Sequence, residues 1–335
     1  MTSEKVKLLW IDDDLDHRED VRNLESKNRR LHIRFVIANE FEKILREKAD
    51  TDLFVIDDKL RLGKYRDGIA VAGQIRVKFP EVPIYLFSAW IGPRSIYGTL
   101  AEAAESSADK IVDIKEIRRK GHRILYCDAL DYRRIRYSRR GTVHALFELL
   151  HAPASDENRI TMALPESLKK GLSSLSGKKP ASGNAIAFAK WTSRTFLALP
   201  GFVFDSLYSA TKLGMTQEAF DRHESAFKLA RYDGIFAETR EALWWGSILV
   251  ETVFRRAATR FPRDATIDLQ QLTPRLLRLG KSEIAKCIIC GRERPDTVGM
   301  ERDDEEHREA VHYRCSIPHP AKRRVICFDE IRQFG

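Results

Sequence analysis

Acidic residues end two apolar stretches near the beginning of this 335-residue chain. Residues 8–11 are followed by Asp12 and Asp13, and residues 53–56 are followed by Asp57. Such apolar runs are typical of buried parallel strands, whose carboxyl ends gather at one edge of a sheet. Carboxylates that meet there repel one another unless a hard divalent cation lies among them, and Mg²⁺ prefers oxygen ligands. The spacing therefore predicts a magnesium site of the kind that also holds a phosphate.

Sulfur and imidazole ligands form a second pattern near the other end of the chain. Cys287 and Cys290 make a Cys-x-x-Cys-Gly sequence, and His312 and Cys315 follow as His-x-x-Cys. Three thiolates and an imidazole are a ligand set that tetrahedral zinc prefers, and four protein ligands close the site, so the metal would be structural. The pattern resembles zinc-ribbon and treble-clef knuckles. Alternative ligands lie nearby and could replace one of the last two: His307, His319 and Cys327.

The acidic positions also fit a family pattern residue by residue. Asp12 and Asp13 match an acidic metal-binding pair, and Asp57 closes an Asp-Leu-x-x-x-Asp sequence. Over roughly the first 115 to 120 residues the chain resembles the receiver domain of two-component response regulators. The resemblance implies a doubly wound, five-stranded parallel α/β sheet and phosphorylation of Asp57 by a histidine kinase or a small phosphodonor. It also implies Mg²⁺ bound by Asp12, Asp13, Asp57 and the backbone carbonyl of Lys59.

Two further residues match family positions, and each comes after a later strand-like run. Ser88 comes after the apolar run 82–87 and matches the hydroxyl group that hydrogen-bonds the phosphoryl group. Lys115 matches the family's lysine but arrives one residue late, and Lys110 is the alternative. Because strand side chains alternate, a one-residue slip turns a lysine to the other face unless a bulge corrects it. The resemblance gives Asp57, Ser88 and Lys115 the catalytic roles, and a docking module without phosphotransfer stays an alternative.

Composition and length indicate a multidomain protein with a net charge of +9 and 43% hydrophobic residues. No apolar run approaches the roughly 20 residues of a membrane span, and the N-terminus lacks a secretory signal, so we expect a cytoplasmic protein without a membrane partner. The expected parts are an α/β receiver-like domain, a basic helical extension, an all-α domain and a small zinc-stabilised α+β lobe. They span residues 1–120, 121–155, 156–283 and 284–335.

The basic extension and the helical region are the candidate output surfaces. Arginines with interleaved tyrosines can bind phosphates and stack on bases, so DNA or RNA is a candidate partner, beside a solvated linker or a surface for an acidic protein. Apolar residues at three- and four-residue spacings predict helices over 216–230, 235–258 and 264–284. Their aromatic residues form either a core or a groove for a protein partner. The arginines concerned are Arg133, Arg134, Arg136, Arg139 and Arg140.

Together these patterns predict a response-regulator-like signalling protein of bacterial type. Phosphorylation of Asp57 would switch a helical and zinc-bound output region that binds a protein or a nucleic acid. One alternative is a phosphorylation-independent adaptor in a regulatory or defence complex, and a second is a DNA- or RNA-binding regulator. The sequence contains no recognisable Ser-His-Asp set, glycine-rich nucleotide loop or His-Glu-x-x-His motif, so no enzyme activity beyond that of the receiver is expected.

Overall fold

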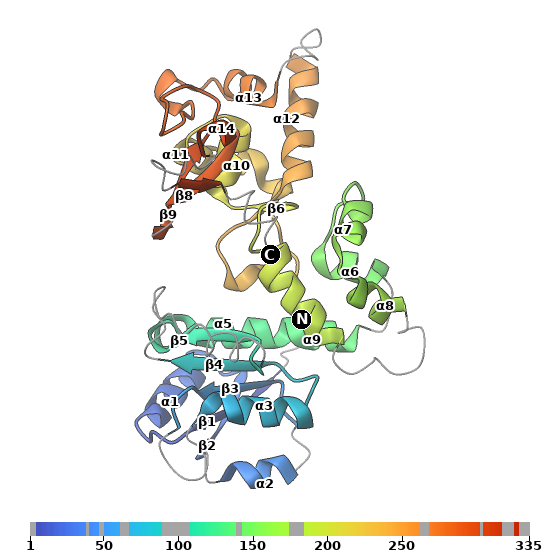
Figure 1. Ribbon diagram of the computed structural model, residues 1–335, viewed down its shortest axis with the longest axis vertical. Coiled ribbons are helices and arrows are strands. Elements are labelled where there is room, and N and C mark those ends of the chain that lie inside the picture. The colour runs from blue at the N-terminus through green and yellow to red at the C-terminus, as the bar shows by residue number, and fades with distance from the viewer. Residues whose placement is uncertain are drawn as a thin grey trace. The chain divides into compact units, whose positions relative to one another are not determined.

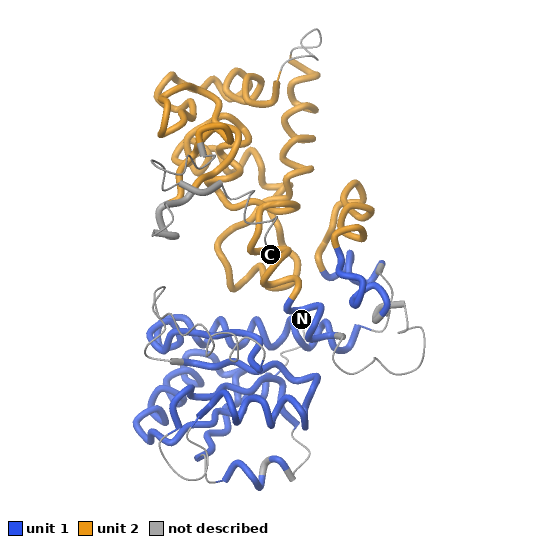
Figure 2. The backbone as a smooth tube through the Cα atoms, viewed as in Figure 1, with its two compact units in different colours: residues 1–149, 164–190 blue, residues 150–163, 191–335 orange. Residues whose placement is uncertain are grey.

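The chain forms two compact units in the computed structural model (Figure 2). Unit 1 comprises Met1–Leu149 and Leu164–Lys190, and unit 2 comprises Leu150–Ala163 and Trp191–Gly335. None of the described helices is both long enough and apolar enough to cross a membrane. The structure describes residues 5–37, 40–46, 50–60, 67–88, 107–138, 143–173, 184–260, 268–301, 304–316 and 325–327.

A five-stranded parallel sheet forms the centre of unit 1 (Figure 1). Its strand order is β2-β1-β3-β4-β5, and every neighbouring pair is parallel. The strands that end in Asp12, Asp57 and Ser88 therefore finish at the same edge of the sheet. The predicted parallel sheet is confirmed. The strands are β1 (Val6–Asp12), β2 (Leu31–Ile37), β3 (Leu53–Asp57), β4 (Ile84–Ser88) and β5 (Lys110–Asp113).

Both faces of this sheet are apolar because helices cover each of them. Alternate strand residues such as Leu9, Phe54 and Ile84 pack with α2 and α3 in one core. On the opposite face, Trp10 and Phe87 bring their rings to 4.7 Å between centroids. The helices of unit 1 are α1 (His17–Lys27), α2 (Phe41–Arg46), α3 (Gly68–Lys78), α5 (Ile114–Tyr137), α6 (Val143–Leu150), α8 (Glu166–Ser173) and α9 (Asn184–Trp191).

Helix α5 continues through the residues expected to start a separate basic extension. The expected boundary at residue 120 falls inside this helix, because its apolar face continues through Leu125 and Tyr132, both of which are buried. Gly121 lies where α5 meets α1, and a Cβ atom there would lie 3.2 Å from the Leu24 side chain. Residues up to Tyr137 are therefore one packed layer of unit 1.

Unit 2 packs helices around a core of its own. Its helical elements are α7 (Glu157–Ala163), η3 (Thr192–Phe196, a π-helix), α10 (Ser206–Leu213), α11 (Gln217–His223), η4 (Glu224–Ala230), η5 (Ala237–Thr239), α12 (Gly246–Arg260), α13 (Leu269–Leu277), η6 (Lys281–Glu283) and α14 (Tyr313–Ser316). A large core joins α10 to α13 and includes Phe220, Phe227 and Trp244.

The helix predicted over 235–258 begins only at Gly246. Before it, Phe236 has a positive φ of 62°, and β7 (Trp244–Trp245) pairs with β6 (Val203–Phe204). Periodicity did not detect this pair because two-residue strands are too short to show alternation. The region predicted as all-α thus contains a small antiparallel bridge.

The C-terminal part of unit 2 contains a three-stranded antiparallel sheet in the order β10-β8-β9. Its strands are β8 (Thr297–Glu301), β9 (Asp304–Val311) and β10 (Val325–Cys327). His312 of the predicted His-x-x-Cys pair lies between β9 and α14, and Cys315 lies in α14.

Candidate functional site

An acidic cluster lies at the carboxyl edge of the parallel sheet. Parallel pairing of β1 with β3 matches Ile11 with Ile56, so both strands end together. Carboxylate oxygens of Asp12, Asp13 and Asp57 come within 4.8 Å of one another. Asp12 and Asp13 are buried, and Asp57 is partly exposed. The sequence-predicted ligands are thus brought together in an oxygen-rich cluster that suits a hard divalent cation.

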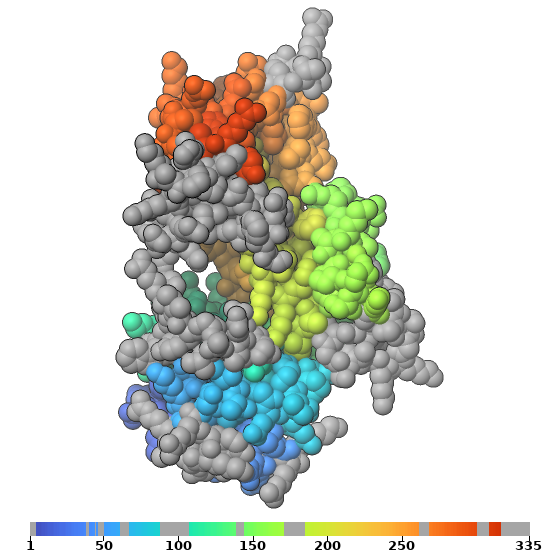
Figure 3. All heavy atoms as spheres, in the orientation of Figure 1, coloured from blue at the N-terminus to red at the C-terminus, as the bar shows by residue number. Residues whose placement is uncertain are grey.

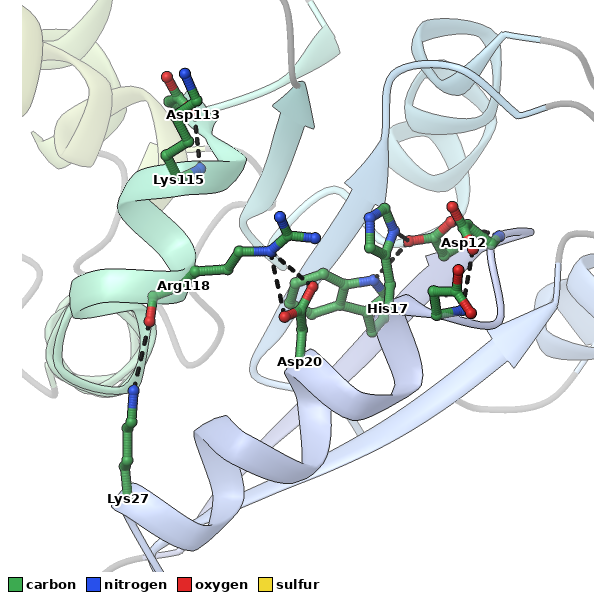
Figure 4. A network of polar contacts seen from close by, with 10 residues as sticks. Asp12, His17, Asp20, Lys27, Asp113, Lys115 and Arg118 are labelled. Carbon is green, nitrogen blue, oxygen red and sulfur yellow. Dashed lines mark hydrogen bonds and ion pairs between the residues drawn. The ribbon is translucent and has the colours of Figure 1, made fainter.

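Three hydrogen bonds hold the Asp12 carboxylate (Figure 4). The Trp10 indole N–H donates to it over 3.1 Å, and the backbone N–H of Asp14 donates over 2.9 Å. Nδ1 of His17, in the first turn of α1, lies 2.6 Å from Asp12 Oδ2. This hydrogen bond raises the pKa of His17. Sequence reasoning missed Trp10 and His17, although a histidine five residues after an acidic strand end was a usable signal.

The environment of Asp57 disfavours a bare carboxylate. Burial and the nearby charges of Asp12 and Asp58 raise the pKa of Asp57 to about 7, although a backbone hydrogen bond from Lys59 opposes the shift. That bond places the backbone of Lys59 against Asp57, while the Lys59 side chain is exposed. Three converging acids of this kind have the donor set for Mg²⁺, because a bound cation removes their mutual repulsion.

Gly68 allows α3 to begin beside this cluster. A Cβ atom at this position would lie 1.9 Å from the backbone oxygen of Asp57, so a larger residue would displace the end of β3. Asp67 caps the helix by accepting a hydrogen bond from the Ile69 backbone N–H over 2.8 Å. The Asp-Gly pair of the sequence therefore sets the spacing between β3 and α3.

Ser88 lies at a strand end, but the predicted lysine, Lys115, lies away from the acidic cluster. Ser88 ends β4 in register with Asp113, the last residue of β5, and its side chain is outside the described residues. Lys115 is exposed in the first turn of α5, where its backbone N–H donates to Asp113 over 2.7 Å, apart from Asp12 in Figure 4. The structure thus places Lys115 beyond the strand end, and Asp113 occupies the register position opposite Ser88.

The alternative lysine, Lys110, lies at the start of β5 and faces α5. Its Nζ is 3.1 Å from Oδ2 of Asp128, and the ammonium group lies over the Tyr85 ring at 5.6 Å from the centroid. The Tyr85 hydroxyl donates to the same carboxylate oxygen over 2.6 Å. Lys110 therefore balances a buried charge of α5 instead of reaching the acidic cluster.

Arginines predicted to bind nucleic acid have carboxylate partners within unit 1. Arg133 pairs with Asp52 and also donates to the Lys5 carbonyl, at the amino-terminal edge of the sheet. Nη1 of Arg134 lies 3.2 Å from Asp131, and Nε of Arg136 lies 3.3 Å from Glu81. The pairs of Arg133 and Arg136 tie α5 to the sheet edge opposite the acidic cluster, whereas the pair of Arg134 lies within α5. The remaining two predicted residues, Arg139 and Arg140, lie outside the described residues.

The thiol and imidazole groups predicted to bind zinc also converge. Ligand atoms of Cys287, Cys290, His312 and Cys315 lie within 4.8 Å of one another. Gly291 has a φ of 70° and its N–H donates to the Cys287 carbonyl over 2.8 Å, which forms the tight turn of a Cys-x-x-Cys-Gly knuckle. Of the alternatives, His319 and the side chains of His307 and Cys327 are outside the described residues.

Backbone groups prepare this cluster for a cation. The N–H of His312 lies 3.3 Å from Cys287 Sγ. Although burial raises the pKa of Cys287, backbone hydrogen bonds from His312, Cys290 and Ile289 lower it to about 6. Nε2 of His312 lies 3.1 Å from the Glu293 carbonyl and Nδ1 lies 3.4 Å from Cys290 Sγ. With Nε2 donating to the Glu293 carbonyl, Nδ1 is the nitrogen left to bind metal, because a hydrogen bond to one ring nitrogen fixes the orientation of a histidine ligand.

Solved receiver domains match the N-terminal region. That of the response regulator NarL from Mycobacterium tuberculosis is 22% identical, with 38% of this chain and 98% of that chain covered and a TM-score of 0.30. The receiver domain of NtrX from Brucella abortus is 23% identical, with 37% and 98% covered and a TM-score of 0.31. The RcsB receiver from Salmonella enterica serovar Typhimurium, in the presence of phosphomimetic BeF3−, is 17% identical, with 37% and 88% covered and a TM-score of 0.31.

No family model and no curated protein matches this chain. The three solved structures named above each cover less than half of it, in the N-terminal region. This region is similar in fold to the receiver domains of response regulators.

Proposed function

We propose that unit 1 is a magnesium-dependent receiver switch with Asp57 as its phosphoacceptor. The convergence of Asp12, Asp13 and Asp57 within 4.8 Å carries this proposal. A partner histidine kinase or a small phosphodonor supplies the phosphoryl group. An Asp57 carboxylate oxygen attacks phosphorus, an acyl phosphate forms, and the donor leaves with the electrons of the broken bond. Bound Mg²⁺ would neutralise the charge of the phosphoryl group and the carboxylates.

The residues around Asp57 prepare it for this reaction. His17 and Trp10 keep the Asp12 carboxylate oriented within the cluster. Lys59 contributes its backbone at the same place, and Ser88 ends the neighbouring strand. Phosphorylation adds charge and hydrogen-bond acceptors at one sheet edge, and such changes bias a two-state surface. For the partner of the output region we favour a protein over a nucleic acid, because Arg133 and Arg136 already pair with Asp52 and Glu81.

Intact-mass spectrometry tests this proposal directly. The full chain is incubated with Mg²⁺ and acetyl phosphate or with a phosphorylated histidine kinase, beside an EDTA control. We expect one phosphoryl adduct on the parent and on Asp16→Asn, an exposed control near the cluster, and none on Asp57→Asn. An adduct that persists on Asp57→Asn, or no adduct with either donor, would overturn the proposal.

A second candidate is a phosphorylation-independent adaptor, favoured by the end of β5. Asp113 is in register with Ser88 there, and Lys115 is exposed in α5. An adaptor would not bind Mg²⁺ and would form the same stable protein complex with Asp57→Asn as with the parent chain. Calorimetric titration with Mg²⁺, followed by size-exclusion chromatography of the complex, separates the two candidates.

We further propose that zinc is a structural metal of unit 2. Its ligands are Cys287, Cys290, His312 and Cys315, whose arrangement matches the donor set and tetrahedral number that zinc prefers. Four protein ligands leave no open position for water, so the metal would stabilise the knuckle and the sheet that follows it. Metal analysis of the purified chain should give one zinc ion per molecule.

A further inference from the structure

Unit 2 contains a cavity of about 430 Å³ that neither metal cluster uses. It is lined by residues of α10, α12 and α13 together with α7 and the segment that contains β6. Helix α12, in light orange, lies along the surface of the unit in Figure 3. The volume falls in the range of small-molecule sites, roughly 300 to 1,000 Å³. Such a cavity is large enough for a ligand of about ten non-hydrogen atoms.

One side of the cavity is apolar. Leu213, Leu249 and Leu269 line it. The first two are buried members of the main core of unit 2, so Leu269 and Val250 offer the apolar surface that a ligand can reach. Val250 lines the cavity as well and is 38% exposed, so the cavity is open to solvent beside this residue. Removing apolar ligand surface from water here is favourable by about 25 cal/mol per Å².

Two cations lie at the same cavity. Arg159 Nη1 is 2.9 Å from Asp156, and its guanidinium group lies over the Phe202 ring at 5.2 Å. Lys212 Nζ donates to the Asp296 carbonyl over 2.7 Å and lies over the Tyr208 ring. These contacts hold both cations in place before a ligand arrives. They use only part of each donor set, because an arginine has five N–H donors and a lysine has three, and the other donors can bind a ligand.

The charge balance of this site favours an anion. The lining residues include Arg159, Lys212 and the hydroxyl-bearing Ser247 but no carboxylate. Asp156, which is buried behind them, accepts from both Ser247 and Arg159 and balances one of the two cations. Lys212 remains as net positive charge beside an apolar wall. We propose that this cavity binds a small amphipathic anion, in which a carboxylate or phosphate group meets the cations and an apolar body meets Leu269 and Val250.

Binding of octanoate to the full chain tests this proposal. Isothermal titration calorimetry compares octanoate with octanol, which has the apolar body alone, and with inorganic phosphate, which has the charge alone. We expect saturable binding of octanoate and at least tenfold weaker binding of the other two probes. Lys212→Met should weaken octanoate binding about tenfold, as loss of one hydrogen bond between charged groups does. Val250→Trp, at a partly exposed position, should block the cavity while the protein stays folded.

The control is Arg255→Met, which removes an exposed cation of α12 that pairs with Glu251 and does not line the cavity. It should leave octanoate binding unchanged. Equal affinity for octanol and octanoate, unaltered binding by Val250→Trp, or equal effects of Lys212→Met and Arg255→Met would each overturn the proposal. Circular dichroism of every variant confirms that a loss of binding is not a loss of fold.

Discussion

Cys290 offers a sharp test of the proposed zinc site because its thiol is exposed and belongs to no core cluster. It is exposed in the knuckle, so Cys290→Ser removes a ligand but no buried contact of the core. Serine has nearly the same shape, and a neutral hydroxyl group is a poor zinc ligand beside a thiolate. Any loss of stability in this variant therefore reports on the metal.

The expected magnitude follows from the number of ligands. Structural zinc contributes about 10–16 kcal/mol of apparent binding free energy in zinc-finger peptides. Shared among the four converging ligands, this is about 3 kcal/mol for each, or roughly a hundredfold in affinity. The whole contribution is comparable to the stability of a domain, about 5–15 kcal/mol, so complete removal of zinc should unfold the knuckle.

Competition with a chromogenic chelator measures the affinity, and hydrogen exchange detected by mass spectrometry measures local stability. We expect Cys290→Ser to lose zinc about a hundredfold more readily and to lose amide protection around Gly291 and His312, whose segment packs at the knuckle. Cys127→Ser, which removes a half-buried cysteine of α5 in unit 1, is the matched control. Unchanged zinc affinity in Cys290→Ser, or equal loss in both variants, would refute the reasoning.

Two further substitutions test unit 1. Tyr85→Phe removes the hydroxyl that donates over 2.6 Å to a buried carboxylate of α5. Urea titration should therefore show that the free energy of unfolding falls by about 1.5–3 kcal/mol. The control Tyr126→Phe, at a half-buried position, should lower it by less than about 0.5 kcal/mol. Similar losses in both would contradict the role of that bond. Gly68→Ala would place its Cβ 1.9 Å from the backbone oxygen of Asp57, so the phosphoryl adduct should disappear in the mass spectrum. Gly73→Ala, also in α3 but with its nearest neighbour 3.8 Å away, should keep the adduct.

The sequence by itself predicted features whose causes are local or periodic. Continuous apolar runs ending in Asp12 and Asp57 predicted parallel strands, and the five-stranded sheet confirms them. The Cys-x-x-Cys-Gly spacing predicted a knuckle because its turn spans only a few residues, with Gly291 at positive φ. Where short elements alternate, periodicity failed: the helix predicted over 235–258 begins only at Gly246.

Only the tertiary structure decided which side chains meet across distant segments. His17 reaches Asp12 because α1 begins directly beside the end of β1. Arg133 meets Asp52, 81 residues away in sequence, because α5 extends to the amino-terminal edge of the sheet. A string of arginines has the same local pattern whether it faces a nucleic acid or an internal carboxylate, since both partners accept the same hydrogen bonds.

The cavity of unit 2 is also a feature that only the tertiary structure reveals. Arg159 and Lys212 are 53 positions apart in the sequence, and neither lies in a recognisable motif. Packing of α10, α12 and α13 brings leucines of all three helices to the same cavity. Sequence thus determined the strands, their acidic ends and the knuckle, because those depend on neighbouring residues. The partners of each charge and the shape of each cavity depend on how the helices pack, and only the tertiary structure decides them.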